Sequence, residues 1–172
     1  MDFLELAKTR YAVRSYQDKP VEQEKFEKIL EAGRVAPTAA NRQPQQIIAV
    51  RSAEGLEKLK KACSVYEAPL ALIVCADHNA SWKRPFDGKD TDDIDASIVT
   101  THMMLEAVNL GLGTIWVCYF KPDVINAEFN LPQGIVPVNV LGIGYAAGKA
   151  SSPDRHATER KPLNETVIYE GF

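Results

Sequence analysis

Residues 36–46 read A-P-T-A-A-N-R-Q-P-Q-Q and lie between a segment with helical spacing and a segment of strand character. The polar side chains in this stretch are mainly amides and a hydroxyl, and they are Thr38, Asn41, Gln43, Gln45 and Gln46. Pro37 and Pro44 restrict the backbone that carries them. Such a segment suits a flat, neutral ligand that needs hydrogen bonds. The alternative interpretation is a plain polar loop after a helix that stops at Pro37.

The length and composition are those of one globular domain, residues 1–172, because a chain of about 150 residues buries roughly 70% of its unfolded surface. A net charge of -3, with no basic stripe, argues against a nucleic-acid partner held through phosphates. The longest apolar-rich run, residues 94–116, contains Thr, His, Glu and Asn, so no membrane partner is expected.

Three cysteines, at positions 63, 75 and 118, form no C-x-x-C motif and cannot make a disulfide framework by themselves. The N-terminus has neither the basic start nor the apolar run of a signal peptide. Both features predict a cytoplasmic protein.

Hydrophobic spacing along the chain predicts alternating helices and strands. Helices are expected from Asp2 to Arg10, from Pro20 to the stop at Pro37, over residues 54–62, over 92–110 and from Pro122. Strands are expected over residues 47–50, 70–76, 113–120 and 138–144. The helix over 92–110 is apolar nearly all round in its second half, so it is either the central helix of the domain or half of a subunit interface.

Residues 77–93 form a long polar connector that is expected to be a loop or a lid beside a site. Its acidic end contains Asp90, Asp92, Asp93 and Asp95. These residues fit no calcium-loop spacing, and they stand where a helix N-terminus favours negative charge, so no metal site is predicted.

The last part of the chain, about residues 145–172, shows no helical period and ends in apolar residues. They are Val167, Ile168, Tyr169 and Phe172. An extended arm that embraces a partner subunit would give these side chains something to pack on.

Common catalytic motifs are missing. Gly142, Gly144 and Ala147 match G-x-G-x-x-A after a strand, but no helix follows, as a dinucleotide fingerprint requires. There is no G-x-S-x-G, and the three histidines are not paired with an obvious nucleophile. No catalytic side chain is therefore assigned.

Arginines and the amide-rich stretch form the one coherent set, because Arg10, Arg14 and Arg160 offer cations for a phosphate while the amides serve a planar ring. Four pieces of sequence occur in order: R-Y-A-V-R-S-Y-x-x-x-P-V, A-P-T-A-A-N-R-Q-P, D-I-D-A-S-I...M-M-L-E-A...G-L-G-T-I-W and R-K-P-L-N-E. With this order and spacing the chain resembles the FMN-dependent nitroreductase family from Arg10 to about Val167.

The resemblance implies an α+β nitroreductase-like fold with a central mixed sheet of about four to five strands flanked by helices. It implies a homodimer with two FMN sites at the interface and a C-terminal arm added to the partner subunit. It also implies ping-pong transfer of hydride from NADH or NADPH through FMN to a nitroaromatic, a quinone or another small electron acceptor.

Residue roles follow from the same resemblance. Arg10 and Arg160 would hold the FMN phosphate, and Arg14 would face the pyrimidine edge, where a cation makes the flavin readier to accept a hydride. Thr38 and Asn41 would bind ribityl and ring atoms, with Gln43 close by. The other residues implied to bind the cofactor are Tyr11, Ala12, Pro37, Trp116, Val117 and Cys118, the last three at a strand end where a backbone N–H would reach N5.

The chain departs from the family's pattern at three positions. Ala12 replaces a hydroxyl, Gln45 replaces an aromatic, and Thr158 replaces a cation for which Lys149, Arg155 or Lys161 would have to substitute. These changes leave two alternatives open: a non-catalytic module that stores or senses FMN, and a specialised, dehalogenase-like reductase of the same family.

Overall fold

The computed structural model describes residues 2–172 and contains a four-stranded sheet in the order β1-β2-β4-β3. The strands are β1 (Gln45–Val50), β2 (Leu70–Asp77), β3 (Gly113–Val117) and β4 (Ile135–Gly144). Every neighbouring pair is antiparallel. The predicted α+β class is confirmed, but the predicted mixed sheet is an antiparallel one. The parallel pairing among residues 2–172 is a single isolated bridge between Ala12 and Thr114.

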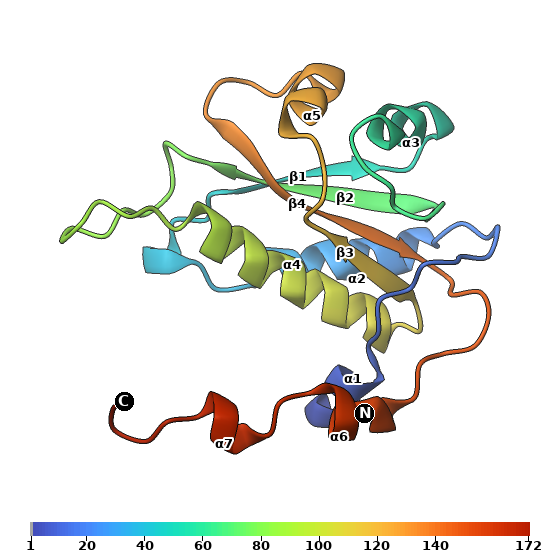
Figure 1. The fold of residues 1–172 in the computed structure, drawn as a ribbon. Coiled ribbons are helices and arrows are strands. Elements are labelled where there is room, and N and C mark those ends of the chain that lie inside the picture. The colour runs from blue at the N-terminus through green and yellow to red at the C-terminus, as the bar shows by residue number, and fades with distance from the viewer. Residues whose placement is uncertain (1) are drawn as a thin grey trace.

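Helices cover both faces of the sheet (Figure 1). The longer ones are α1 (Phe3–Thr9), α2 (Gln23–Arg34), α3 (Ala53–Lys60), α4 (Asp92–Asn109) and α5 (Pro122–Phe129). Short helices are η1 (Ala39–Asn41), η2 (Pro153–Arg155), α6 (His156–Glu159) and α7 (Leu163–Thr166). Helices α2 and α4 lie on one face, and α3 and α5 lie on the other. Within residues 2–172, none of these helices combines the length and apolar character needed to cross a membrane.

Strand β2 is apolar throughout because both of its faces are buried. Leu70, Leu72 and Val74 belong to the core on the side of α2 and α4. The alternate residues Ile73 and Cys75 belong to the core on the side of α3 and α5. Since side chains alternate across a strand, one continuous apolar run serves two cores.

Helix α4 is the central helix, the first of the two roles that its sequence left open. It packs on α1, on α2 and on all four strands. A Cβ on Gly33 of α2 would lie only 2.9 Å from the Cγ and Sδ atoms of Met103 in α4. The missing side chain at position 33 therefore allows the two helices to approach closely.

The N-terminal segment after α1 runs along the sheet edge. The Val13 N–H donates to Thr114 O at 2.9 Å, and the Gln17 N–H donates to Tyr145 O at 2.8 Å. Because side chains alternate along an extended segment, Val13 is buried while Arg14 is exposed.

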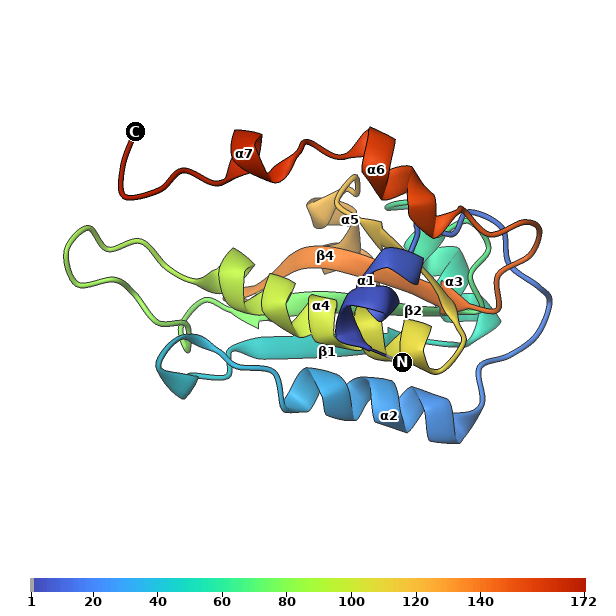
Figure 2. The same ribbon diagram turned by 90° about the horizontal axis from the view of Figure 1, so that it is seen from below.

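Several predicted boundaries differ from the structure. The helix predicted from Pro20 to Pro37 spans Gln23–Arg34, and β4 begins at Ile135 instead of Val138. Strand β1 begins at Gln45, so Gln45 and Gln46 belong to the sheet rather than to the loop, and β3 ends at Val117 instead of Phe120. The last 28 residues, predicted to lack helix, contain η2, α6 and α7. Helices of one turn are too short to show a hydrophobic period, so the sequence could not reveal them. Figure 2 shows this C-terminal segment running past α1 towards the end of the chain.

Candidate functional site

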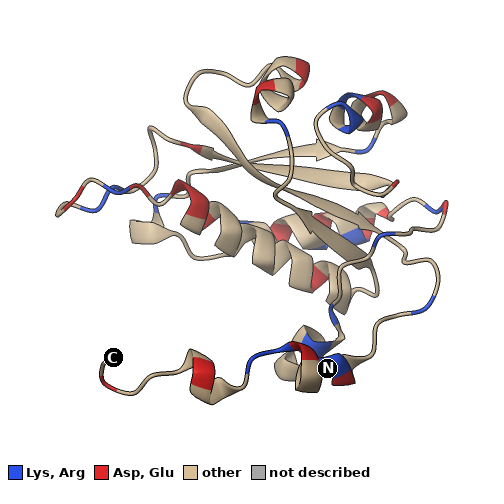
Figure 3. Ribbon diagram, in the orientation of Figure 1, with Lys and Arg blue, Asp and Glu red and all other residues tan. Residues whose placement is uncertain are grey.

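Four arginines line one cavity of about 510 Å³ beside the C-terminal end of α1: Arg10, Arg14, Arg155 and Arg160. The other lining residues are Tyr11, Ala12, Ser151, Ser152 and Glu159. Figure 3 shows Lys and Arg segments gathered where α1 meets the C-terminal helices. The fold thus brings together cations that are about 150 positions apart in the sequence.

The C-terminal helices are fixed to the end of α1 through its unpaired carbonyl groups. Arg155 donates from Nη2 to the carbonyl oxygen of Arg10 at 2.6 Å and from Nη1 to that of Lys8 at 3.4 Å. Its Nη1 also donates to Ser152 O, within the C-terminal segment, at 2.8 Å. The Nε2 of His156 lies 3.1 Å from the carbonyl oxygen of Lys8. Because the last carbonyls of a helix have no partner within the helix, they are natural acceptors for these side chains.

The cavity concentrates positive charge. The pKa of Arg10 is lowered from its ordinary value, first by burial and then by the charges of Arg155 and Arg160. Within residues 2–172, none of the four arginines forms an ion pair with a carboxylate. Four cations and one carboxylate, that of Glu159, line the cavity, so positive charge is in excess there. Such an excess makes a site for an anion, and guanidinium groups match phosphate geometry.

Arg14 also lines a second hollow, of about 190 Å³, at the end of β3. Its other lining residues are Ser64, Tyr66, Ile115, Trp116, Val117, Cys118 and Tyr119. The guanidinium carbon of Arg14 lies 5.7 Å from the centre of the Tyr66 ring. Arg14 therefore joins the arginine cavity to the strand end at which the sequence placed Trp116, Val117 and Cys118.

The remaining predicted residues, Pro37, Thr38, Asn41 and Gln43, lie elsewhere. Figures 1 and 2 both show their loop, which includes η1, at the opposite end of α4 from the arginine cavity. None of the cavities formed by residues 2–172 that are described here includes members of both groups. One chain alone does not bring the two halves of the predicted site together.

The loop over residues 37–43 has an unusual backbone. Ala40, Asn41 and Gln43 have φ values of 49°, 51° and 51°. Left-handed conformations at residues other than glycine cost free energy and persist only where the surroundings impose them. Within the loop, Thr38 Oγ1 accepts from the Gln43 N–H at 3.0 Å, and Gln43 Nε2 donates to Asn41 O at 3.3 Å.

Several residues of this arrangement were not among the predicted site residues; besides Ser151, Ser152 and Glu159 in the cavity lining, they include Arg155 and Asp95. Arg155 was named only as one of three possible substitutes for the cation missing at Thr158, and it lines the cavity. Asp95, interpreted as a helix N-terminal charge, is fully buried and accepts from the Ala39 N–H of the loop. No local pattern signals a contact across 56 positions.

The fold also gathers three potential metal ligands at the base of the 77–93 connector, where the sequence predicted none. The ligand atoms of His78, Asp90 and Asp92 lie within 4.8 Å of one another. His78 Nδ1 is 2.7 Å from Asp92 Oδ2, and Lys83 Nζ is 3.4 Å from the other ring nitrogen. The hydrogen bond between His78 and Asp92 accounts for the position of the histidine without a metal ion.

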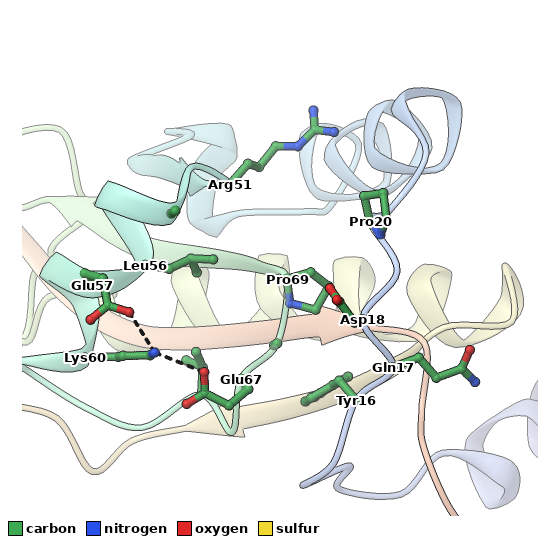
Figure 4. Close-up of a pocket in the computed structure, with 13 residues that line it drawn as sticks. Tyr16, Gln17, Asp18, Pro20, Arg51, Leu56, Glu57, Lys60, Glu67 and Pro69 are labelled. Atoms are coloured by element: carbon green, nitrogen blue, oxygen red, sulfur yellow. Dashed lines mark hydrogen bonds and ion pairs between the residues drawn. The ribbon is translucent and has the colours of Figure 1, made fainter.

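A further cavity of about 530 Å³ lies between α3 and residues 16–20 (Figure 4). Its central cation, Lys60, is paired with Glu57 at 2.8 Å and with Glu67 at 3.0 Å. Arg51, the other cation of this cavity, donates to Gln23 Oε1 at 2.6 Å and to Val21 O at 3.2 Å. The lining carboxylates Asp18, Glu57 and Glu67 offset both cations, so this cavity lacks the excess of positive charge found at the arginine site.

Comparisons with known proteins agree with the fold and the motifs. A model of the nitroreductase family matches residues 7–64 and 58–145. A nitroreductase family protein of Clostridium difficile 630, solved by crystallography, is 54% identical and superposes with a TM-score of 0.98 over 100% of both chains.

Two other relatives have names that state a cofactor. The FMN reductase [NAD(P)H] of Bacillus subtilis is 28% identical over 91% of this chain and 71% of its own length. An FMN-dependent nitroreductase of Clostridium difficile R20291 is 25% identical, with a TM-score of 0.76 over 99% of this chain and 100% of its own.

A relative from Methanothermobacter thermautotrophicus is 33% identical over 96% of this chain and 88% of its own length, and its name includes NADH dehydrogenase/NAD(P)H nitroreductase. The family model covers well over half of the chain, and the relatives extend over nearly all of it. The chain therefore belongs to the nitroreductase family.

Proposed function

We propose that this chain is an FMN-dependent oxidoreductase that passes hydride from NADH or NADPH to a nitroaromatic, a quinone or another small electron acceptor. We further propose a ping-pong mechanism in a homodimer with two FMN sites at the interface. The names of the relatives support the cofactor and the nicotinamide co-substrate.

The observation that carries the proposal is the arginine cavity. Arg10, Arg14, Arg155 and Arg160 meet there with no ion-paired carboxylate among residues 2–172, and burial lowers the pKa of Arg10. A phosphate group supplies the negative charge that this arrangement lacks. Hydrogen bonds to a charged group contribute about 1.5 to 3 kcal/mol each, which is enough to retain a cofactor.

Bound FMN would supply the two-electron chemistry, and the chain would supply binding and electrostatics. Arg10, Arg155 and Arg160 would hold the phosphate. Arg14 continues from this cavity into the hollow at the end of β3, so its cation would lie towards the ring system. No acid or base side chain is required, because hydride moves directly between stacked rings.

A second copy of the chain would complete the site. The arginine cavity and the 37–43 loop lie at different ends of one chain, so a ligand that needs both must bridge two chains. The C-terminal arm exposes large apolar side chains, with Leu163 at 79% and Tyr169 at 87% exposure. Burying such side chains against a partner would stabilise the dimer.

The 77–93 connector would border this site as a loop or lid. Figures 1 and 2 show it at the same end of α4 as the 37–43 loop. An isolated bridge between Lys83 and Asp90 holds its two sides together as a finger. In a dimer it would therefore contribute to the choice of electron acceptor.

Purified protein tests this function directly. It should be yellow or should bind added FMN, and anaerobic NADH or NADPH should bleach the flavin absorbance. Parallel double-reciprocal plots against a nitroaromatic or quinone are expected for ping-pong transfer. A protein that binds no FMN contradicts the proposal, and bound flavin that neither nucleotide bleaches favours the storage or sensing alternative.

A further inference from the structure

A carboxylate from α4 holds the strained loop of residues 37–43. Asp95 is 0% exposed, and its Oδ1 accepts from the Ala39 N–H at 2.8 Å. Ala39 opens η1, and the side chain of the preceding Thr38 makes no capping hydrogen bond there. Asp95 thus takes the place of a local cap, at the point where the chain enters its left-handed residues.

The second oxygen of Asp95 is bound by the 77–93 finger. Thr91 Oγ1 donates to Asp95 Oδ2 at 2.8 Å, and Ser81 Oγ lies 3.3 Å from the Thr91 hydroxyl. The Thr91 N–H donates to Trp82 O at 3.1 Å. Ser81 and Thr91 are 5% and 7% exposed, so this series of hydrogen bonds lies out of contact with bulk water.

The helix dipole alone does not account for such a residue. An acidic side chain benefits from a helix N-terminus while it remains in water, as the exposed Asp93 does. Burying a carboxylate is costly unless hydrogen bonds compensate for lost hydration. Asp95 is buried with both oxygens bound, one by Ala39 and the other by Thr91, two residues that are 52 positions apart in the sequence.

We infer that Asp95 is a positioning residue that fixes the 37–43 loop in its ligand-binding shape and couples that loop to the 77–93 finger. The inference rests on the proposed function for the part played by the loop in flavin binding. The coupling of loop and finger through one buried carboxylate does not depend on a bound ligand. A displacement of the finger would then be transmitted to Thr38 and Asn41.

Two substitutions at position 95 separate positioning from packing. Asp95→Ala removes both acceptors and leaves the Ala39 N–H without a partner. Asp95→Asn keeps a carbonyl oxygen that accepts from the Ala39 N–H, and its NH₂ group can donate to Thr91 Oγ1. The Thr91 hydroxyl would then donate to Trp82 O, which lies 3.2 Å away. The matched control is Thr100→Val in the same helix. It removes the hydrogen bond from fully buried Thr100 to Asn139, and this bond does not involve the loop.

Hydrogen exchange of the flavin-free protein provides the first measurement. The N–H groups of Asn41, Arg42 and Gln43 are hydrogen-bonded within the loop. In Asp95→Ala we expect their protection, and that of residues 79–91, to fall at least about fivefold, the equivalent of about 1 kcal/mol for an unpaired buried group. Asp95→Asn should recover most of the protection, and Thr100→Val should match wild type in both segments.

The FMN dissociation constant, measured by fluorescence quenching, is the second readout. It should rise at least about fivefold in Asp95→Ala, by the same free-energy argument. It should remain near wild type in Thr100→Val at an equal loss of Tm. If Asp95→Ala does not fold, Thr91→Val takes its place, with faster exchange expected in both segments.

The inference is overturned if loop and finger exchange change no more in Asp95→Ala, or in Thr91→Val, than in Thr100→Val. A wild-type protein that binds no FMN would defeat the proposed function instead. The exchange comparison would still decide the coupling, so the two failures are distinguishable.

Discussion

The arginine cavity and the 37–43 loop are both candidate halves of one site, yet they are built by different physical means. The cavity gathers full charges on three short segments, and the backbone around it is ordinary. The loop carries amides, with one exposed cation at Arg42, on a backbone with three left-handed residues that is hydrogen-bonded to buried Asp95. Affinity in the cavity should come from charge, whereas the loop should depend on shape.

The largest expected effect is at the cavity. Arg10→Ala or Arg160→Ala should each raise the FMN dissociation constant by about 10- to 100-fold, because a charge-assisted hydrogen bond contributes about 1.5 to 3 kcal/mol. The dependence of binding on salt should weaken in both variants. Fluorescence titration at several salt concentrations measures both quantities.

Arg34→Ala is the control for this experiment. Arg34 is exposed on α2 and paired with Glu31, and its removal should leave FMN binding unchanged. Equal weakening in Arg34→Ala would mean that overall charge, rather than the cavity, determines binding.

A smaller effect is expected in the loop. Thr38→Val removes the acceptor for the Gln43 N–H while preserving side-chain shape. The FMN dissociation constant should rise about 3- to 10-fold, since one hydrogen bond contributes about 0.5 to 1.5 kcal/mol, with an unchanged salt dependence. Ser52→Ala, which removes a similar bond to Gly55 N at the start of α3, is the matched control. If the salt dependence of FMN binding also changed in Thr38→Val, the loop would contribute through charge as the arginine cavity does, contrary to this prediction.

Arg14 connects the cavity to the end of β3, so its loss should alter the flavin more than the affinity. Arg14→Ala should lower the two-electron reduction potential by about 30 to 60 mV, the equivalent of one charge-assisted interaction. The dissociation constant should change less than in Arg160→Ala. Spectroelectrochemistry measures the potential. Identical affinity losses and identical potentials in Arg10, Arg14 and Arg160 variants would contradict this division of roles.

The smallest effect concerns cysteine reactivity beside Arg14. Cys118 is exposed, whereas burial raises the pKa of Cys63 to about 11 and that of Cys75 to about 12. Since the thiolate is the reactive form, a thiol reagent at pH 8 should modify Cys118 first. Bound FMN should slow this reaction about a few-fold, because it would occupy the hollow that Cys118 lines and would block the reagent. Unslowed modification, followed by mass spectrometry, would place the flavin elsewhere.

The same two buried thiols give a prediction for stability against pH. Their folded pKa values lie above those of an unfolded chain, so the stabilisation from burying the neutral thiols is complete below about pH 8.5. It is lost as the pH rises towards 11 and 12. Cys75→Ala should therefore lose less Tm between pH 8 and 11 than wild type does, measured by thermal denaturation.

Most of the fold was predictable from local patterns. The apolar run at Leu70–Ala76, the spacing in Phe26 and Ile29, and Pro122 at the start of a helix each reflect burial or backbone preference within a few residues. The boundaries of β1, β3 and β4 were wrong by two or three residues because pairing between strands, rather than composition, sets strand ends. The one-turn helices near the C-terminus were missed for lack of a period.

The sequence by itself determined the buried strands, the order of the main elements, the family motifs and the cations at positions 10, 14 and 160. These features depend on side-chain chemistry and on neighbours along the chain. Only the tertiary structure decided that Arg155 binds the carbonyl of Arg10, 145 positions away, and that Asp95 supports the loop. These long-range hydrogen bonds depend on how the elements pack in space. A single polar residue that bonds to a distant backbone group produces no periodic pattern in the sequence.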